Sequence, residues 1–190
     1  FGPAIYHLMF SLVSKISPLI SCRKYILRKK IGKIVAPSQI NSQWMEEPKE
    51  HEFNEPKLLY VGRIRKEKGI YSLLSLLKEN KTNLTLSIVG AEKNSSTLIA
   101  QSGVNIYEVE NNEQNLIKFY DDHNIFVLPS YTEGHPMVLL EALSRLRPVI
   151  IFKDIEHVIG DKKGIFVADR NLNSFLEQIN YIKKNYKTIQ

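Results

Sequence analysis

The sequence predicts an α/β fold: a Rossmann-like parallel sheet with helices on both faces, preceded by part of a second domain. From residue 57 onward, short apolar strands alternate with amphipathic helices, and this alternation is typical of a parallel sheet covered on both sides. The chain of 190 residues is 43% hydrophobic and 24% charged, so it can bury a core and does not resemble a disordered chain. Residues 1 to about 45 lack the alternation, which indicates a separate domain.

Six strands are expected: KLLYVG (57–62), LTLSIVG (84–90), VNIYEV (104–109), IFVLPS (125–130), PVIIF (148–152) and GIFVA (164–168). Helices are expected at 69–79, 112–122 and 137–145 and after the last strand, where apolar residues recur at helical spacing. Asn112 is a candidate cap for the second of these helices. Ligands bind outside the carboxyl ends of parallel strands. The loops after residues 62, 90, 109, 130 and 152 are therefore the candidate ligand sites.

The chain divides into three predicted parts. Residues 1–45 are the remnant of an N-terminal domain, 46–56 a linker, and 57–190 a Rossmann-like domain. KIVAPS (33–38) resembles a strand of the remnant, and residues 43–57 are charged, contain two prolines and show little periodicity. Because the chain begins with Phe1 rather than Met, we expect that the start of the natural protein is missing.

The positive charge is concentrated near the N-terminus. The net charge is +6, and six cations lie within residues 23–33: Arg23, Lys24, Arg28, Lys29, Lys30 and Lys33. Such a run can meet anionic lipid, acidic saccharide or nucleic acid, or simply form a solvated helix face. Aromatic residues do not interleave with it apart from Tyr25, which disfavours nucleic acid.

The apolar stretch at 4–20 is too short and too interrupted for a membrane span, and it lacks the basic start of a signal peptide. We expect a buried or interfacial helix there, and attachment through 23–33 to an anionic membrane surface at the inner face of the cytoplasmic membrane. The single cysteine, Cys22, excludes an internal disulfide and fits the cytoplasm. Asp121, Asp122 and His123 are adjacent, but without matching ligands elsewhere they do not predict a metal site.

The loop VGRIRKEKG (61–69) carries the first candidate site. Gly62 permits a sharp turn after the strand, and Arg63 and Lys68 stand at the two ends of the loop. The N-terminus of the following helix favours an anion, and a guanidinium with an ammonium beside it suits a diphosphate. The alternative is a basic loop whose charges are merely solvated.

The loop PSYTEGHPMVLLEAL (129–143) carries the second candidate site. Glu133 precedes a helix and Glu141 falls on it, and the amides of Gly134, His135, Met137 and Val138 lie between them, whereas Pro136 has none to offer. Carboxylates accept hydrogen bonds from sugar hydroxyls, and free amides suit phosphate oxygens. The alternative is that Glu133 complements the helix N-terminus and Glu141 pairs with Arg145.

Together these loops resemble the retaining GT-B glycosyltransferases called glycosyl transferases group 1. VGRIRKEKG is similar to their GR-x4-KG segment, and EGHPMVLLE is similar to their two glutamates separated by seven residues. The likeness covers residues 33 to 180 approximately. It implies transfer of a hexose from a nucleotide-diphosphate sugar to a saccharide or lipid-linked acceptor, with retention of configuration and without a bound metal or other cofactor.

The resemblance also implies a role for each position. Gly62, Arg63 and Lys68 would hold the donor diphosphate. Glu133 would be the catalytic-site carboxylate that binds hydroxyls of the transferred sugar. The amides of Gly134, His135, Met137 and Val138 would bind phosphate or sugar, and Glu141 would bind the ribose. Because the acceptor site and a catalytic histidine of the family lie in the N-terminal domain, we expect this chain alone to bind a sugar nucleotide weakly and to transfer nothing.

Three positions depart from the family pattern. Leu146 replaces a usual glycine, which predicts a different turn before the fifth strand. Glu108 stands where glycine is common, which leaves the base preference open, and His135 stands where an apolar or aromatic residue is usual. The competing functions are a sugar-nucleotide epimerase on the same fold and a non-catalytic module that binds sugar nucleotides or membranes. A nicotinamide dehydrogenase is disfavoured because no G-x-G-x-x-G follows a strand.

Overall fold

The computed structural model describes residues 11–12, 19–21, 32–34, 40–50, 52–79, 84–92 and 102–190. The chain divides into two compact units, Phe1–Ser38 and Gln39–Gln190. In the first unit, β1 (Leu19–Ser21) and β2 (Gly32–Ile34) form a parallel pair in which Leu19 lies opposite Gly32. The predictions for residues 4–20 and 23–33 fall largely outside the described residues. No helix within the described ranges is both long and apolar enough to span a bilayer.

The second unit is built on one parallel sheet of six strands in the order β5-β4-β3-β6-β7-β8. The strands are β3 (Lys57–Val61), β4 (Thr85–Ala91), β5 (Val104–Glu108), β6 (Ile125–Leu128), β7 (Val149–Phe152) and β8 (Ile165–Ala168). All six lie within two residues of the ranges that the sequence predicts. The chain first moves from β3 toward one edge and then returns to build the other half from β6 outward, which is the doubly wound Rossmann order.

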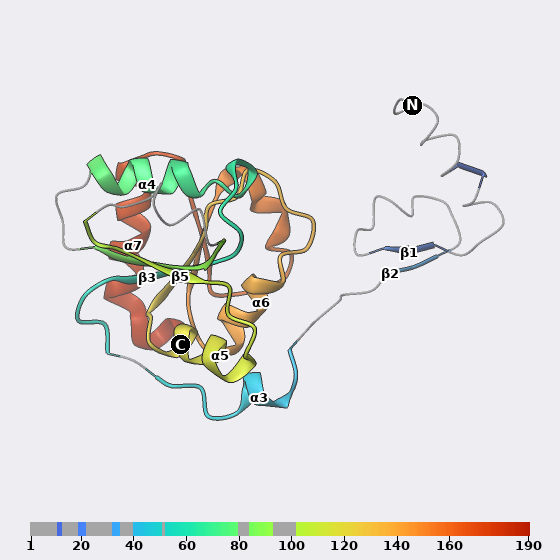
Figure 1. The fold of residues 1–190 in the computed structure, drawn as a ribbon, viewed down its shortest axis with the longest axis horizontal. Coiled ribbons are helices and arrows are strands. Elements are labelled where there is room, and N and C mark those ends of the chain that lie inside the picture. The colour runs from blue at the N-terminus through green and yellow to red at the C-terminus, as the bar shows by residue number, and fades with distance from the viewer. Residues whose placement is uncertain are drawn as a thin grey trace. The chain divides into compact units, whose positions relative to one another are not determined.

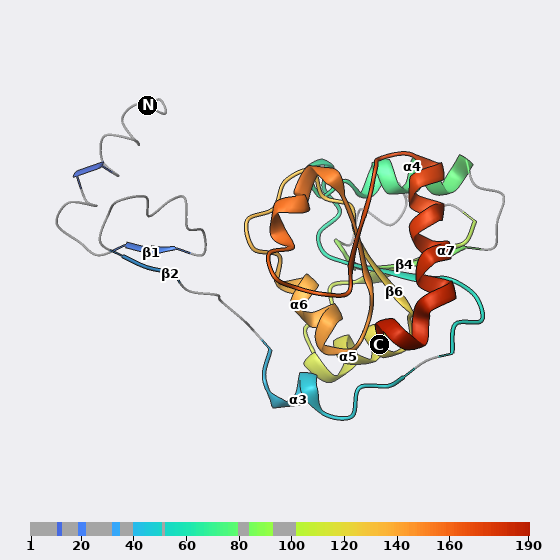
Figure 2. The same cartoon turned by 180° about the vertical axis from the view of Figure 1, so that it is seen from behind.

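Helices cover both faces of this sheet (Figures 1 and 2). One face packs against α4 (Ile70–Glu79) and α7 (Leu172–Ile189). The other packs against α3 (Ser42–Met45), α5 (Glu113–Asp121), α6 (Met137–Ser144) and the 3-10 helix η3 (Lys153–Val158). Successive strand side chains alternate between the two cores: Leu58 and Tyr60 enter the first and Leu59 the second. The predicted α/β fold with helices on both faces is thereby confirmed.

Side-chain caps fix the starts of two helices. The Asn112 carboxamide oxygen accepts from the amide of Asn115 at 3.0 Å, as the sequence predicts for α5. Asn171 caps α7 in the same way through the amide of Ser174 at 2.9 Å. Each cap satisfies an amide of the first helical turn and so fixes where the helix begins.

Part of the segment predicted to be a linker is packed within the second unit. Arg145, only 2% exposed, pairs with Asp121 at 2.8 Å. The same guanidinium donates to three backbone carbonyls, those of Trp44, Glu46 and Glu47. Arg147, also buried, donates to the carbonyl of Lys49. Residues 44–49 are therefore a fixed part of this unit.

The turn between α6 and β7 contains a strained residue. Leu146 has φ of 59°, in the left-handed region where a side chain crowds the backbone and glycine is favoured. The Leu146 amide donates to the carbonyl of Leu143 at 3.1 Å. A glycine-type turn is thus present even though the glycine usual in similar sequences is not.

Candidate functional site

Both candidate loops leave the sheet at the point where its strand order reverses. β3 and β6 are neighbours in the middle of the sheet, with Leu58 opposite Ile125. The loop from 62 to 69 follows β3, and the loop from 129 to 136 follows β6. Successive crossovers diverge to opposite sides at such a switch point, which opens a crevice for ligands above the strand ends.

The first loop turns away from β3 at Gly62, which lies close to Gly90 of β4. Gly62 has φ of 151° and donates its amide to the carbonyl of Val89 at 2.9 Å. A Cβ atom on Gly90 would lie 2.5 Å from the Gly62 carbonyl oxygen, so only glycine fits at position 90. The buried Tyr60 hydroxyl donates to the carbonyl of Arg63 at 2.8 Å. Burial, followed by the nearby negative charge of Glu133, raises the pKa of Tyr60, which keeps this hydroxyl a donor.

The backbones of the two loops touch each other. Gly69 ends the short 3-10 helix η1 (Lys66–Lys68) with φ of 68°. A Cβ atom at this position would lie 1.8 Å from the carbonyl oxygen of Pro129, a distance that no side chain can accept. The amide of Tyr131 donates to the carbonyl of Glu67 at 3.0 Å. The two loops therefore form one continuous rim.

Two oppositely charged site residues meet across this rim. The Lys68 ammonium lies 2.7 Å from Oε1 of Glu133, and their side chains are 27% and 9% exposed. The hydroxyl of Ser130, itself fully buried, donates to the same carboxylate oxygen at 2.6 Å. Arg63 is exposed on the same loop as Lys68. The structure thus brings Lys68 and Glu133 together.

The amide donors lie at the start of α6, directly after Glu133. Pro136 occupies the cap position of α6 and its side chain offers no hydrogen bond. Met137 and Val138 form the first helical turn and are partly exposed, as is His135, whereas Gly134 is exposed. A helix start without a side-chain cap retains amide donors and a partial positive charge that suit an anion.

Glu141 is more deeply placed than the other site residues. It is 6% exposed, and one of its oxygens accepts from the Tyr120 hydroxyl at 2.8 Å. Burial raises the pKa of the Glu141 carboxyl, while the bond from Tyr120 acts in the opposite direction. The alternative pairing with Arg145 is replaced by the pair between Arg145 and Asp121. A buried carboxylate with a spare oxygen can hold a hydroxyl group of a ligand.

Sequence reasoning missed several residues that support the site. Ser130 stands in the predicted loop without an assigned role, and Tyr60 reads only as a core residue. His157 of η3 places Nε2 2.9 Å from the carbonyl oxygen of Glu133. Arg170, after β8, donates to the carbonyls of Pro129 and Ser130. The contacts of His157 and Arg170 join residues that are 24 to 41 positions apart in the chain, so local spacing cannot predict them.

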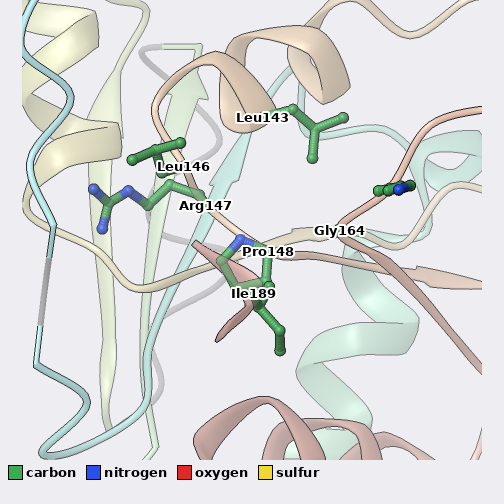
Figure 3. Close-up of a pocket in the computed structure, with 7 residues that line it drawn as sticks. Leu143, Leu146, Arg147, Pro148, Gly164 and Ile189 are labelled. Atoms are coloured by element: carbon green, nitrogen blue, oxygen red, sulfur yellow. The ribbon is translucent and has the colours of Figure 1, made fainter. Parts of the chain in front are cut away.

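A separate hollow lies at the amino ends of the strands, opposite the ends that carry the two loops (Figure 3). It encloses about 160 Å³ and is lined by Leu143, Leu146, Arg147, Pro148, Lys163, Gly164 and Ile189. Pro148 and Gly164 immediately precede β7 and β8, so this hollow opens at the amino ends of the strands. It is not the rim that carries Lys68 and Glu133.

Comparison with known proteins identifies related sequences. The family model described as Glycosyl transferases group 1 matches residues 43–190. A Bacillus subtilis (strain 168) protein named "Putative teichuronic acid biosynthesis glycosyltransferase TuaC" is 29% identical over 123 residues, covering 64% of this chain and 31% of that protein. The capsular polysaccharide biosynthesis glycosyltransferase CapM of Staphylococcus aureus is 29% identical over 133 residues, 63% of this chain and 34% of that protein. The chain thus spans only a third or so of the length of these curated relatives.

Solved structures share the fold. HepE of Anabaena, solved with UDP and glucose, has a TM-score of 0.70 at 13% identity and covers 98% of this chain and 59% of that chain. Sucrose-phosphate synthase of Thermosynechococcus elongatus has a TM-score of 0.69 at 18% identity, covering 93% and 51%. At these identities the likeness shows the fold alone, and that fold is the Rossmann-like half of a GT-B architecture.

Proposed function

The chain belongs to the glycosyl transferases group 1 family, and on this premise we propose that it forms the donor-binding half of a retaining glycosyltransferase. The donor is a nucleotide-diphosphate sugar, and the acceptor is a saccharide or a lipid-linked saccharide. The contact between Lys68 and Glu133 carries this proposal. The contact supports the proposal because a cation suited to a diphosphate lies beside a carboxylate suited to sugar hydroxyls at one rim of the sheet.

The cations and amides of the rim suit the leaving group. As the bond between the anomeric carbon and the diphosphate breaks, negative charge grows on the leaving phosphate and positive charge on the sugar. Arg63, Lys68 and the first-turn amides of α6 would stabilise the leaving diphosphate. The acceptor oxygen would bond to the anomeric carbon on the same face, and its proton would pass to the leaving phosphate oxygen. We propose that these protein groups neutralise the diphosphate without a metal ion, so that EDTA would leave donor binding unchanged.

The two carboxylates suit the two sugars of the donor. Glu133 is partly exposed beside Lys68 and would bind hydroxyls of the transferred sugar. Glu141 lies about one helical turn into α6 and would bind the ribose through the oxygen that Tyr120 leaves available. Both residues stand at the positions to which the family resemblance assigns these roles. The names of the curated relatives, which concern teichuronic acid and capsular polysaccharide biosynthesis, support a saccharide acceptor.

Titration calorimetry tests the diphosphate site. The chain is titrated with UDP, GDP and ADP, and the diphosphate that binds best is then compared between the wild type and Lys68→Ala. Loss of a charge-assisted contact is expected to weaken binding by about tenfold or more. Lys66→Ala is the matched control, because Lys66 lies in the same short helix η1 and is exposed. Equal affinities of the wild type and Lys68→Ala would refute the proposed site.

The basic segment at 23–33 leads to a separate proposal. We propose that it attaches the protein to anionic lipid at the inner face of the cytoplasmic membrane. Lys33, the one cation of this segment whose side chain is described, is exposed. Binding to vesicles of phosphatidylglycerol and phosphatidylcholine should fall as salt rises and as the six cations are replaced by glutamine. Co-sedimentation that is insensitive to both changes would contradict this proposal.

A further inference from the structure

We propose that Arg170 is a positioning residue that fixes Glu133 for the sugar of the donor. This inference rests on the proposed function, because it concerns the same site. Arg170 follows β8, at the far edge of the sheet from β5. Its guanidinium nevertheless reaches the loop after β6, which carries Glu133.

Arg170 contacts the loop after β6 at its first two residues. Nη1 donates to the carbonyl of Pro129 at 2.9 Å, and Nη2 donates to the carbonyl of Ser130 at 3.3 Å. Ser130 in turn donates its hydroxyl to the Glu133 carboxylate at 2.6 Å. One guanidinium therefore holds the backbone of the residue whose side chain orients Glu133.

The same contact reaches the other loop of the site. The carbonyl oxygen of Pro129 is the atom against which Gly69 packs, and Nη1 of Arg170 would lie 3.3 Å from a Cβ atom at position 69. Gly69 directly follows Lys68, the partner of Glu133. Arg170 thus stands behind the junction where the diphosphate loop and the sugar loop meet.

The guanidinium itself is held by three neighbours. Asp154 of η3 accepts from Nη2 at 2.7 Å and from Nε at 3.2 Å. The guanidinium carbon lies 4.0 Å from the ring centre of Tyr131 and 4.4 Å from that of Phe152. A planar guanidinium can stack between two rings while its edges donate to a carboxylate and two carbonyls, and an ammonium cannot. The position therefore uses properties that arginine alone possesses.

A positioning role is separable from a purely structural one. If Arg170 only stabilised the fold, its loss would lower the melting temperature and weaken every ligand alike. If it places Glu133, its loss should spare the nucleoside diphosphate, which Lys68 and Arg63 hold, and reduce the additional affinity that the sugar provides. The ratio of the two affinities is the quantity that distinguishes these cases.

The experiment compares wild type, Arg170→Gln and Arg170→Lys, with Lys153→Gln as the control. Lys153 is an exposed cation beside Asp154, so its replacement changes the charge of the same rim without changing the stacked guanidinium. UDP with UDP-glucose and GDP with GDP-mannose are titrated as matched pairs. Amide hydrogen exchange over residues 129–135 is measured in the ligand-free proteins.

Arg170→Gln should accelerate exchange at 129–135 and reduce the affinity ratio of sugar conjugate to diphosphate by about tenfold, since small misplacements of a positioned group are costly. Arg170→Lys should be intermediate, and Lys153→Gln should match the wild type. An unchanged ratio, or an equal loss for both ligands, would overturn the role of Arg170. If the wild type binds no member of either pair, the proposed function fails. The exchange data alone then decide whether Arg170 orders the loop, and unchanged exchange at 129–135 in Arg170→Gln would overturn that role.

Discussion

Two ion pairs in this chain join segments that are distant in sequence, yet they differ in almost every other respect. The pair between Arg145 and Asp121 is 3% and 6% exposed, and the arginine also donates to three backbone carbonyls. The pair between Lys68 and Glu133 is 27% and 9% exposed and stands at the carboxyl edge of the sheet. The first pair has every donor engaged by protein, whereas the second can exchange its partner for a ligand.

We infer that the first pair stabilises the fold, and we propose that the second serves ligand binding. A buried charge costs several kcal/mol to desolvate, so it persists only where partners surround it. A partly exposed pair contributes about 1 kcal/mol or less to stability and can open at little cost. Substitutions in the first pair should therefore affect folding, and substitutions in the second should affect ligands.

The largest effect is expected from Asp121→Ala. This change leaves the buried Arg145 guanidinium without its carboxylate and should lower the free energy of unfolding by about 3–5 kcal/mol. Asp122→Ala is the control, because Asp122 is adjacent but exposed, and it should change stability by about 0.5 kcal/mol or less. Urea unfolding followed by circular dichroism measures both, and similar values for the two variants would contradict the distinction.

The two substitutions in the pair between Lys68 and Glu133 should affect different parts of the ligand. Lys68→Ala should weaken the nucleoside diphosphate by about tenfold. Glu133→Gln should not weaken the diphosphate, because it removes a negative charge beside Lys68, but it should abolish the additional affinity provided by the sugar. Calorimetry with a diphosphate and its sugar conjugate checks both, and parallel losses in the two variants would be inconsistent with divided roles.

Glu141 provides a test that depends on pH. Burial raises its carboxyl pKa above the ordinary 4.5, so the folded protein binds this proton more tightly than the unfolded chain. The resulting stability is present at low pH and is lost as pH rises through the raised pKa. Glu141→Gln keeps an acceptor for Tyr120 without the charge. Its melting temperature relative to wild type should therefore rise as the pH increases above this ordinary glutamate pKa, and a difference that does not change with pH would refute this.

The smallest expected effect concerns the turn at Leu146. Leu146→Ala keeps the strained φ of 59° and loses the side chain, whereas Leu146→Gly loses the side chain and relieves the strain. The glycine variant should therefore be more stable than the alanine variant by about 1 kcal/mol. Thermal unfolding of the two variants measures this difference, and a less stable glycine variant would show that the turn is not strained.

The sequence predicts the sheet well because each strand can be recognised from a short stretch of residues. Uniformly apolar runs such as 125–128 and glycines at strand ends such as Gly62 locate strands and turns, and the two charged loops stand out from the apolar strands before them. The hydrogen bonds from Arg145 and Arg147 to the backbone of residues 44–49 cannot be predicted from local sequence, because donor and acceptor are about 100 residues apart. Arg170 is missed for the same reason: its role depends on strand order, which periodicity does not encode.

The position of a bound donor can be determined from a crystal structure of the chain with the nucleotide sugar that binds best. We expect the diphosphate to lie between the Lys68 ammonium and the start of α6, with the sugar against Glu133 and the ribose at Glu141. Lys68 would then contact phosphate as well as, or in place of, Glu133. A nucleotide that touches only one of the two loops, or that occupies the hollow of Figure 3, would refute the proposed donor site.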